Sequence, residues 1–214
     1  MLPDASGWDP ALYEGSAPYY ARGRLPYPPE MAVVLRDALA LDGRGRLIDV
    51  GCGPGSVALL LEGLFSEVVG VDPDPGMIAA AEAGARERGV ANARWVRMTA
   101  ESLPGGLGRF RMATFAQSFH WMDRATVASI VRAMLEPGGR WVHVDATTHR
   151  GVESAAGLGL PSPPRAAIDD LIRTYLGATR RAGRATLPAG TPSGEDDVMV
   201  AAGFSGPERL RVAG

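Results

Sequence analysis

The stretch Leu47-Ile48-Asp49-Val50-Gly51-Cys52-Gly53-Pro54-Gly55 decides the fold of this chain. An apolar run ends in an acid, three glycines alternate directly after it, and the apolar residues 57–61 follow. This order predicts a buried strand, a tight turn and the start of a helix, which is how α/β proteins hold a nucleotide-like cofactor. Because Gly51 and Gly53 lack a Cβ, the backbone can turn sharply there and approach a ligand closely.

The composition is typical of one globular domain, since 46% of the 214 residues are hydrophobic. The net charge of -2 shows no excess of basic residues of the kind that binds nucleic acid. No apolar run is long enough to span a membrane. The single cysteine and the lack of a Cys/His cluster argue against a disulfide or a metal site. The first residues lack the pattern of a signal peptide, so we expect a cytoplasmic protein. All 22 basic residues are arginine, which, with many Ala, Gly and Pro residues, is typical of a GC-rich bacterial genome.

Strands and helices alternate along the first two thirds of the chain. The patterning predicts strands at about 46–50, 67–72, 93–98, 109–116 and 140–145, and helices at about 28–41, 55–64, 76–88 and 124–135. The run Glu136-Pro137-Gly138-Gly139 predicts a break between the last helix and the last strand. The expected fold is therefore α/β, a Rossmann-like doubly wound and mainly parallel sheet with helices on both faces.

The two ends of the chain are less regular, within what we expect to be a single domain over residues 1–214. Residues 1–29 are rich in Tyr, Arg and Pro and predict an arm or lid, and residues 146–193 predict a possible substrate cap. A helix is expected over 165–182, whose stripe of Ile168, Leu171, Ile172, Tyr175 and Leu176 should pack on the core or, alternatively, cover a pocket. A short helix at 194–202 and a sixth strand from about Glu208 should follow.

Asp72 ends the second predicted strand. It follows Gly51 at close to the spacing of about 20 residues that separates a glycine turn from a ribose-binding acid. A carboxylate there can accept hydrogen bonds from both ribose hydroxyls. The alternative role, a helix N-cap, fits Asp74 better, because Asp74 lies directly before the helix that we expect from Gly76.

In this order the motifs resemble a class I S-adenosylmethionine-dependent methyltransferase of the small-molecule type. Asp49 to Gly55 resemble that family's acid-x-Gly-x-Gly-x-Gly signature, and Asp72 stands at the position of its ribose acid. Residues 135–139 resemble the turn before its fifth strand, and Phe119-His120-Trp121 resembles a subgroup that includes trans-aconitate-methyltransferase-like proteins. The resemblance covers residues 19–206.

The resemblance implies S-adenosyl-L-methionine as cofactor and S-adenosyl-L-homocysteine as product. The residues that it places at the cofactor are Tyr20, Arg22, Asp49, Gly51, Cys52, Gly53, Gly55, Asp72, Pro73, Met77, Ala100, Glu101 and Gln117. Asp49 would lie near the ammonium group, and Ala100 and Glu101 beside the adenine. Many relatives carry Asp where Thr99 stands, so Glu101 or backbone groups would contact the adenine amine. Gln117 would line the methyl-transfer site.

The favoured function is methyl transfer to O, N or C of a small metabolite in bacterial secondary metabolism, by a monomer or homodimer. His120 is the best candidate for a base, since histidine titrates near neutral pH; its alternative role is to pack beside Trp121. A macromolecule methyltransferase for RNA or protein and a repurposed cofactor-binding protein remain alternatives. A dinucleotide site is a further alternative, although Ser56 stands where its fingerprint has a third glycine.

The end of the sequence departs from the resemblance. The family usually closes its sheet with an antiparallel seventh strand, whereas this sequence ends at residues 211–214, where the sixth strand would form. We therefore expect the last strand to be missing, or the sheet edge to be completed in trans.

Overall fold

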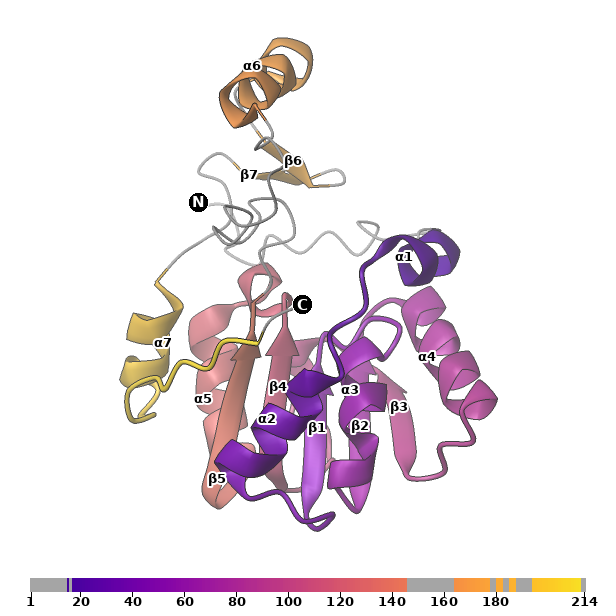
Figure 1. The fold of residues 1–214 in the computed structure, drawn as a ribbon. Coiled ribbons are helices and arrows are strands. Elements are labelled where there is room, and N and C mark those ends of the chain that lie inside the picture. Colours follow the sequence, from indigo (N-terminus) through magenta and orange to yellow (C-terminus); the bar gives the residue numbers. More distant parts are fainter. Residues whose placement is uncertain are drawn as a thin grey trace.

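A five-stranded parallel sheet forms the centre of the molecule in the computed structural model, which describes residues 15, 17–145, 164–177, 180–182, 185–187 and 194–212 (Figure 1). Its strand order is β3-β2-β1-β4-β5. The strands are β1 (Arg46–Val50), β2 (Glu67–Asp72), β3 (Ala93–Arg97), β4 (Phe110–Ala116) and β5 (Leu135–Val144). Every neighbouring pair is parallel, so the doubly wound α/β prediction is confirmed.

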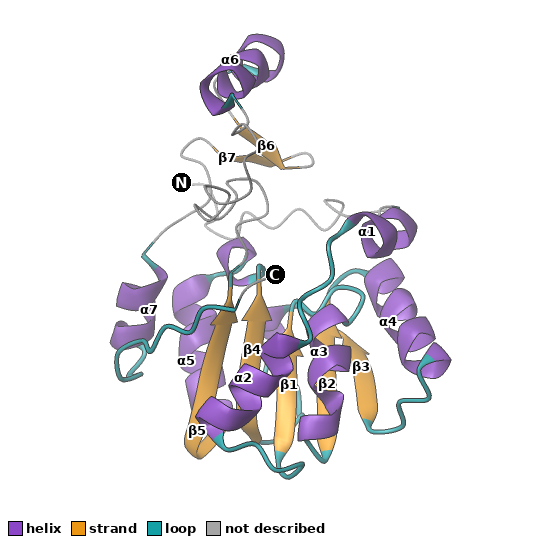
Figure 2. Ribbon diagram, in the orientation of Figure 1, coloured by secondary structure: helices purple, strands orange, loops and turns teal. Residues whose placement is uncertain are grey.

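Helices cover both faces of this sheet (Figure 2). On one face lie α2 (Glu30–Leu39), α3 (Ser56–Leu61) and α4 (Pro75–Glu87). On the other lie α5 (Arg124–Met134) and α7 (Glu195–Ala201), which pack against each other. Short 3-10 turns are η1 (Glu62–Leu64), η2 (Ala100–Ser102) and η3 (Phe119–Trp121). No helix in the described ranges has the length and apolar character needed to cross a membrane.

The core divides into two layers because alternate strand residues point to opposite faces. Ile48 and Val50 of β1 join the cluster under α5, whereas Leu47 joins the cluster under α2 and α3. All three side chains are fully buried. The three inner strands, β1, β2 and β4, are buried along almost their whole length, as expected for a parallel sheet that is covered on both faces.

Trp95 of β3 fills a groove that two glycines leave open on the α3 face. Gly70 of β2 is its neighbour in the sheet register. A Cβ at Gly70 would lie 2.4 Å from the Trp95 Cε3 atom, and one at Gly55 would lie 2.6 Å from Cη2. The indole therefore packs directly behind the glycine turn.

The structure corrects the expected start of β5. The strand begins at Leu135, which pairs with Phe110, and the expected break at residues 136–139 is a register irregularity before Met112 pairs with Arg140. The Pro-Gly-Gly run interrupts the pairing without ending the strand, since bulges absorb such residues within a sheet.

Two expectations for the C-terminal third are wrong. The helix expected over 165–182 is α6 (Arg165–Leu176), which ends at Gly177 with φ 80°. A small antiparallel pair follows, β6 (Arg180–Ala182) and β7 (Ala185–Leu187). The sixth strand expected from Glu208 does not appear in residues 204–212. Instead this segment starts with Phe204 packed on Trp141 of β5.

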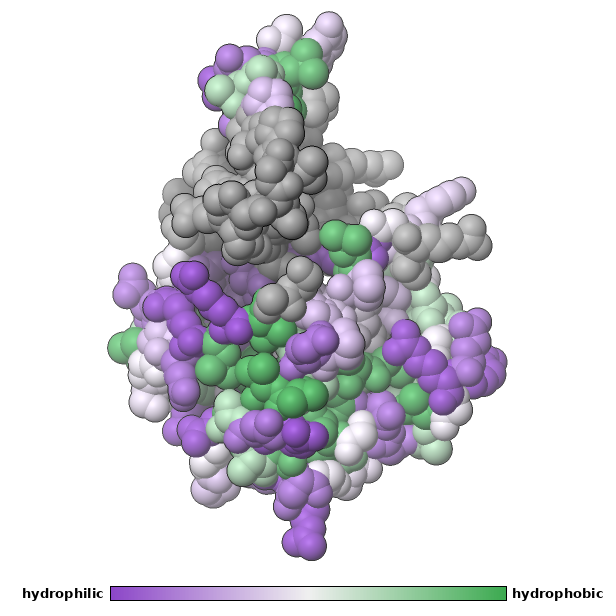
Figure 3. Space-filling model, viewed as in Figure 1, coloured by the Kyte–Doolittle hydropathy of each residue, from purple (hydrophilic) through white to green (hydrophobic). Residues whose placement is uncertain are grey.

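The α6 stripe was also expected to be core, and this is wrong for the side chains that are described. Ile168, Leu171, Ile172 and Tyr175 are all exposed, Tyr175 by 78%. Hydrophobic and hydrophilic surface lie on different sides of this helix (Figure 3). Helical periodicity revealed the amphipathic face but not whether anything packs on it. At the other end, α1 (Ala17–Gly23) forms within the segment expected to be an arm, and packs on α4.

Replacing Gly70 with alanine tests the packing of Trp95. We expect Gly70→Ala to lower the free energy of unfolding by about 1–3 kcal/mol, because the new methyl group overlaps the indole ring. Gly63→Ala is the matched control, since a Cβ there meets no atom within 4 Å. Urea unfolding of the three proteins measures the difference. Equal midpoints for the two variants would contradict this packing.

Candidate active site

The glycine turn lies at the carboxyl ends of β1, β2 and β4, where ligands bind in open α/β sheets. Its entry is fixed by two hydrogen bonds, in which the amides of Gly51 and Cys52 donate to the Val71 carbonyl at 2.8 and 3.0 Å. Gly51, Gly53 and Gly55 have φ angles of 67°, 53° and 78°. All three are left-handed conformations that favour glycine, so the alternating glycines are required by the path of the backbone.

These three glycines face different surroundings. A Cβ at Gly51 would lie 2.6 Å from the Ser118 Cβ, and one at Gly55 would meet Trp95. A Cβ at Gly53 would meet nothing within 4 Å. Gly53 is therefore the glycine of the turn that opens onto free space, whereas Gly51 and Gly55 are constrained by packing.

Asp49 places a buried carboxylate beneath the turn. Its Oδ1 accepts a hydrogen bond from the Thr114 hydroxyl at 2.7 Å, while Oδ2 is buried without a hydrogen-bond partner in the described ranges. Burial raises the pKa of Asp49 to about 6, although the Thr114 hydroxyl and the Ala58 amide lower it. A buried acceptor without a partner is costly, so this carboxylate is suited to a cationic or hydrogen-bond-donating ligand group.

Asp72 connects the turn to the next segment of chain. Its Oδ2 accepts from the Gly53 amide and its Oδ1 from the Asp74 amide, both at 2.9 Å. Burial raises the pKa of Asp72, and these two amides lower it. Each oxygen keeps a further lone pair for a ligand hydroxyl. Asp74 accepts from the amides of Gly76 and Met77, which confirms its expected role as the cap of α4.

Two adjoining cavities open around these groups. The larger encloses about 670 Å³ including its open mouth, and the smaller about 310 Å³. Together they are in the range of small-molecule and cofactor sites. The residues that line both are Tyr20, Gly51, Gly53 and Ala116.

Most of the residues selected from the sequence meet at these cavities. In addition to the shared ones, Asp49 and Cys52 line the smaller cavity. The larger cavity is lined by Asp72, Pro73, Met77, Ala100, Glu101 and Gln117. Gly55 is the exception, because it packs on Trp95 and is not among the described lining residues. The side chain of Arg22 lies outside the described part of the structure.

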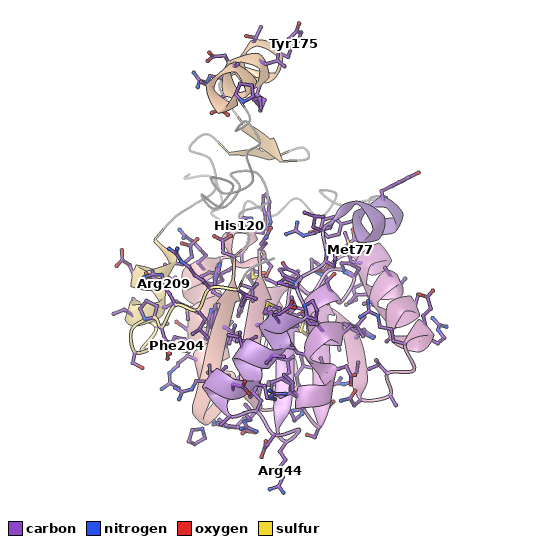
Figure 4. The ribbon with its side chains drawn as sticks, in the orientation of Figure 1. Arg44, Met77, His120, Tyr175, Phe204 and Arg209 are labelled. Carbon is purple, nitrogen blue, oxygen red and sulfur yellow. The ribbon has the colours of Figure 1, made fainter. Side chains whose placement is uncertain are left out.

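His120 lies at the carboxyl end of the sheet, as does Met77 (Figure 4). Its ring centroid is 4.8 Å from that of Trp121, which lines the larger cavity. His120 itself is not among the described residues that line either cavity. Both roles considered for it therefore stay predictions.

Sequence reasoning missed Arg24 and Tyr27, which line the smaller cavity together with Asp49. The Arg24 guanidinium donates to Gln117 Oε1 and lies 5.4 Å from the Tyr20 ring centroid. Burial raises the pKa of Tyr27, and the neighbouring Arg24 lowers it. The Arg-rich arm predicted a guanidinium at the site, and the structure shows that of Arg24 there.

The larger cavity is also lined by residues that were not selected from the sequence as cofactor-binding. They are Ser118, Trp121 and Met122, which follow β4. The Ser118 hydroxyl donates to the Val50 carbonyl at 2.6 Å, which joins the ends of β1 and β4. Trp121 and Met122 lie in and after η3, a turn that hydrophobic periodicity does not reveal.

The two cavities differ in chemistry. The smaller holds a carboxylate with an unpartnered oxygen and an arginine, a combination suited to the ammonium and carboxylate of an amino acid. The larger holds the Asp72 carboxylate among apolar and aromatic side chains. The carboxylate suits the hydroxyl groups of a sugar, and the apolar and aromatic side chains suit a flat base attached to it. A ligand joining an amino acid to a nucleoside would fit both.

Comparison with known proteins agrees with this geometry. Residues 47–139 match the model of a methyltransferase domain family. An uncharacterized methyltransferase of Mycobacterium tuberculosis is 37% identical over 133 residues, covering 62% of this chain and 51% of that protein. The uncharacterized methyltransferase YcgJ of Bacillus subtilis is 35% identical over 102 residues, covering 47% of this chain and 40% of that protein.

A solved structure supports the fold. The S-adenosylmethionine-dependent methyltransferase from Clostridium acetobutylicum matches with a TM-score of 0.52 at 20% identity, covering 61% of this chain and 56% of that one. This chain thus spans about half the length, or less, of the curated relatives described above. The matched segment, these relatives and the parallel sheet support a class I S-adenosylmethionine-dependent methyltransferase.

Proposed function

We propose that this protein binds S-adenosyl-L-methionine in the two adjoining cavities and transfers its methyl group to a small molecule. The observation that carries the proposal is the buried Asp49 Oδ2, which has no partner in the described structure and lies beneath a glycine turn beside an arginine. A site that holds such an acceptor fits a ligand with an ammonium group.

The amino-acid end of the cofactor would lie in the smaller cavity. Asp49 would accept hydrogen bonds from its ammonium group, and Arg24 would donate to its carboxylate. In the described part of the chain the Arg24 guanidinium contacts the neutral side chains of Gln117 and Tyr20. Gly53, where a Cβ would project into open space, would allow the cofactor to approach the backbone.

The nucleoside end would lie in the larger cavity. Asp72 would accept from the ribose hydroxyls while it keeps its two backbone hydrogen bonds. Ala100 and Glu101 in η2 would border the adenine, with Pro73 and Met77 on the α4 side. Glu101 already accepts a hydrogen bond from the Asp123 amide at 3.0 Å, which fixes its carboxylate.

Methyl transfer needs little chemistry from the protein. When bound, the cofactor supplies a methyl group already activated by its sulfonium. The described side chains would orient the two reactants in line and exclude water, so positioning would account for most of the catalysis. For a hydroxyl or ammonium acceptor, His120 would take up the proton released.

A small-molecule acceptor is favoured by the net charge of -2, which offers no footprint for RNA. We also propose a cytoplasmic monomer or homodimer, acting in bacterial secondary metabolism. Two other functions predict different results with labelled cofactor. A macromolecule methyltransferase would label RNA or protein, whereas a repurposed binding protein would bind the cofactor and label nothing.

Calorimetry of the purified protein tests the cofactor site. We expect binding of S-adenosylmethionine, and Arg24→Ala to weaken it about tenfold to a hundredfold, as expected for a charge-assisted hydrogen bond. Arg36→Ala is the matched control, because Arg36 is exposed on α2 and contacts Asp37. Arg22→Ala tests the residue selected from the sequence. Binding of NAD without S-adenosylmethionine would overturn the proposed function.

The Asp49→Asn variant tests the burial of this acid. The pKa of Asp49 is about 6 in the folded protein, against an ordinary value of 3.8 that applies to the unfolded chain. Between pH 3.8 and 6 the folded state therefore binds more protons than the unfolded state. Without ligand, the wild-type protein should therefore lose about 2 kcal/mol of stability, relative to Asp49→Asn, as the pH rises from 4 to 7. Urea unfolding across this range measures the loss.

The exposed Asp37 provides the control, because its pKa is lowered by Arg36 rather than raised. Asp37→Asn should show no such loss with rising pH, and any change should have the opposite sign. A constant difference between wild type and Asp49→Asn across the range would contradict the assigned burial.

His120→Asn separates the two roles of the histidine. As a base, His120 should contribute about a hundredfold or more to kcat. The Kd of S-adenosylmethionine should stay unchanged. The measurement is turnover of labelled cofactor with an accepted small molecule. An unchanged kcat would assign His120 to packing beside Trp121.

A further inference from the structure

The contact between Arg24 and Gln117 crosses the boundary between the two cavities. Gln117 lines the larger cavity at the end of β4, and Arg24 lines the smaller one just after α1. The Arg24 Nη2 donates to Gln117 Oε1, although the two residues are 93 positions apart in the sequence. This hydrogen bond therefore connects the N-terminal segment to the centre of the sheet.

Gln117 has an unusual backbone for this contact. Its φ is 53°, in the left-handed region that is uncommon for residues with a side chain. The surrounding structure holds it there, since its amide donates to the Val144 carbonyl of β5 at 3.0 Å. Such backbone conformations occur where the structure gains something else from them, as at ligand sites.

The side chain of Arg24 is one that a single hydrogen bond can orient. Its guanidinium presents five donors in a rigid plane, so one fixed hydrogen bond orients the remaining donors. The Tyr20 ring at 5.4 Å flanks the same group. Without such contacts a long arginine side chain would lose considerable rotamer freedom on binding a ligand, and affinity would fall.

We propose that Gln117 is a positioning residue that acts on the cofactor through Arg24, rather than a residue that contacts the methyl acceptor. This rests on the proposed function, in which Arg24 binds the cofactor carboxylate. Gln117 orients the guanidinium before the cofactor arrives. The resemblance implied a different role, at the methyl-transfer site.

A double-mutant cycle on the Kd of S-adenosyl-L-homocysteine tests this role. The variants are Gln117→Met, which keeps the length of the side chain without its oxygen, Arg24→Ala, and the two combined. We expect Gln117→Met to weaken binding about threefold to thirtyfold in the wild-type background. In the Arg24→Ala background it should change the Kd less than twofold, because nothing is left to position.

Asp72→Asn is the matched control at the other end of the ligand. It should weaken binding by the same factor with and without Arg24, since the two ends act independently. Thermal unfolding of each variant confirms that it is folded at the temperature of the titration. With a small molecule that the enzyme methylates, Gln117→Met should raise the KM for the cofactor and leave the KM for the methyl acceptor unchanged.

The outcomes separate the two proposals. If the wild-type protein does not bind S-adenosyl-L-homocysteine or S-adenosyl-L-methionine, the proposed function fails. If it binds but the effect of Gln117→Met is as large in the Arg24→Ala background, the positioning role is overturned. A raised KM for the acceptor alone would also overturn it, and would place Gln117 at the methyl-transfer site.

Discussion

The carboxylate of Asp72 holds the candidate site together. It accepts hydrogen bonds from the Gly53 amide in the glycine turn and from the Asp74 amide before α4. The end of β2, the turn after β1 and the approach to α4 are thereby fixed to one side chain. Because these bonds join groups of the protein itself, they hold the site in shape without help from a ligand, which lowers the entropic cost of binding.

Electrostatics complement this framework. Desolvation acts against the charge of both Asp49 and Asp72, and amides and a hydroxyl offset only part of it. The stability of the fold does not require Asp49 to be ionised, and burial opposes its ionisation. A cationic ligand would favour the ionised form of Asp49. The carboxylate that burial destabilises most is therefore the one that such a ligand would stabilise most.

Much of the fold followed from the sequence because β1 to β4 are short apolar runs with clear ends. Asp49, Asp72 and the glycines belong to a local motif, so their meeting at one edge of the sheet was predictable from strand order. Arg24 and Tyr27 were missed because their place depends on how α1 packs on α4, which is a tertiary effect. The prediction that the α6 stripe packs on the core was wrong for the same reason, since periodicity identifies an apolar face but not what packs on it.

The three glycines of the turn have different implications for the evolution of such a domain. Gly51 and Gly55 are hemmed in by Ser118 and Trp95, whereas a side chain at Gly53 would extend into empty space. The left-handed backbone favours glycine at all three positions, and packing adds to this constraint at the outer two, whereas a ligand would add to it at the middle one. Among related sequences, substitutions confined to position 53 would indicate descendants that kept the architecture and abandoned its ligand.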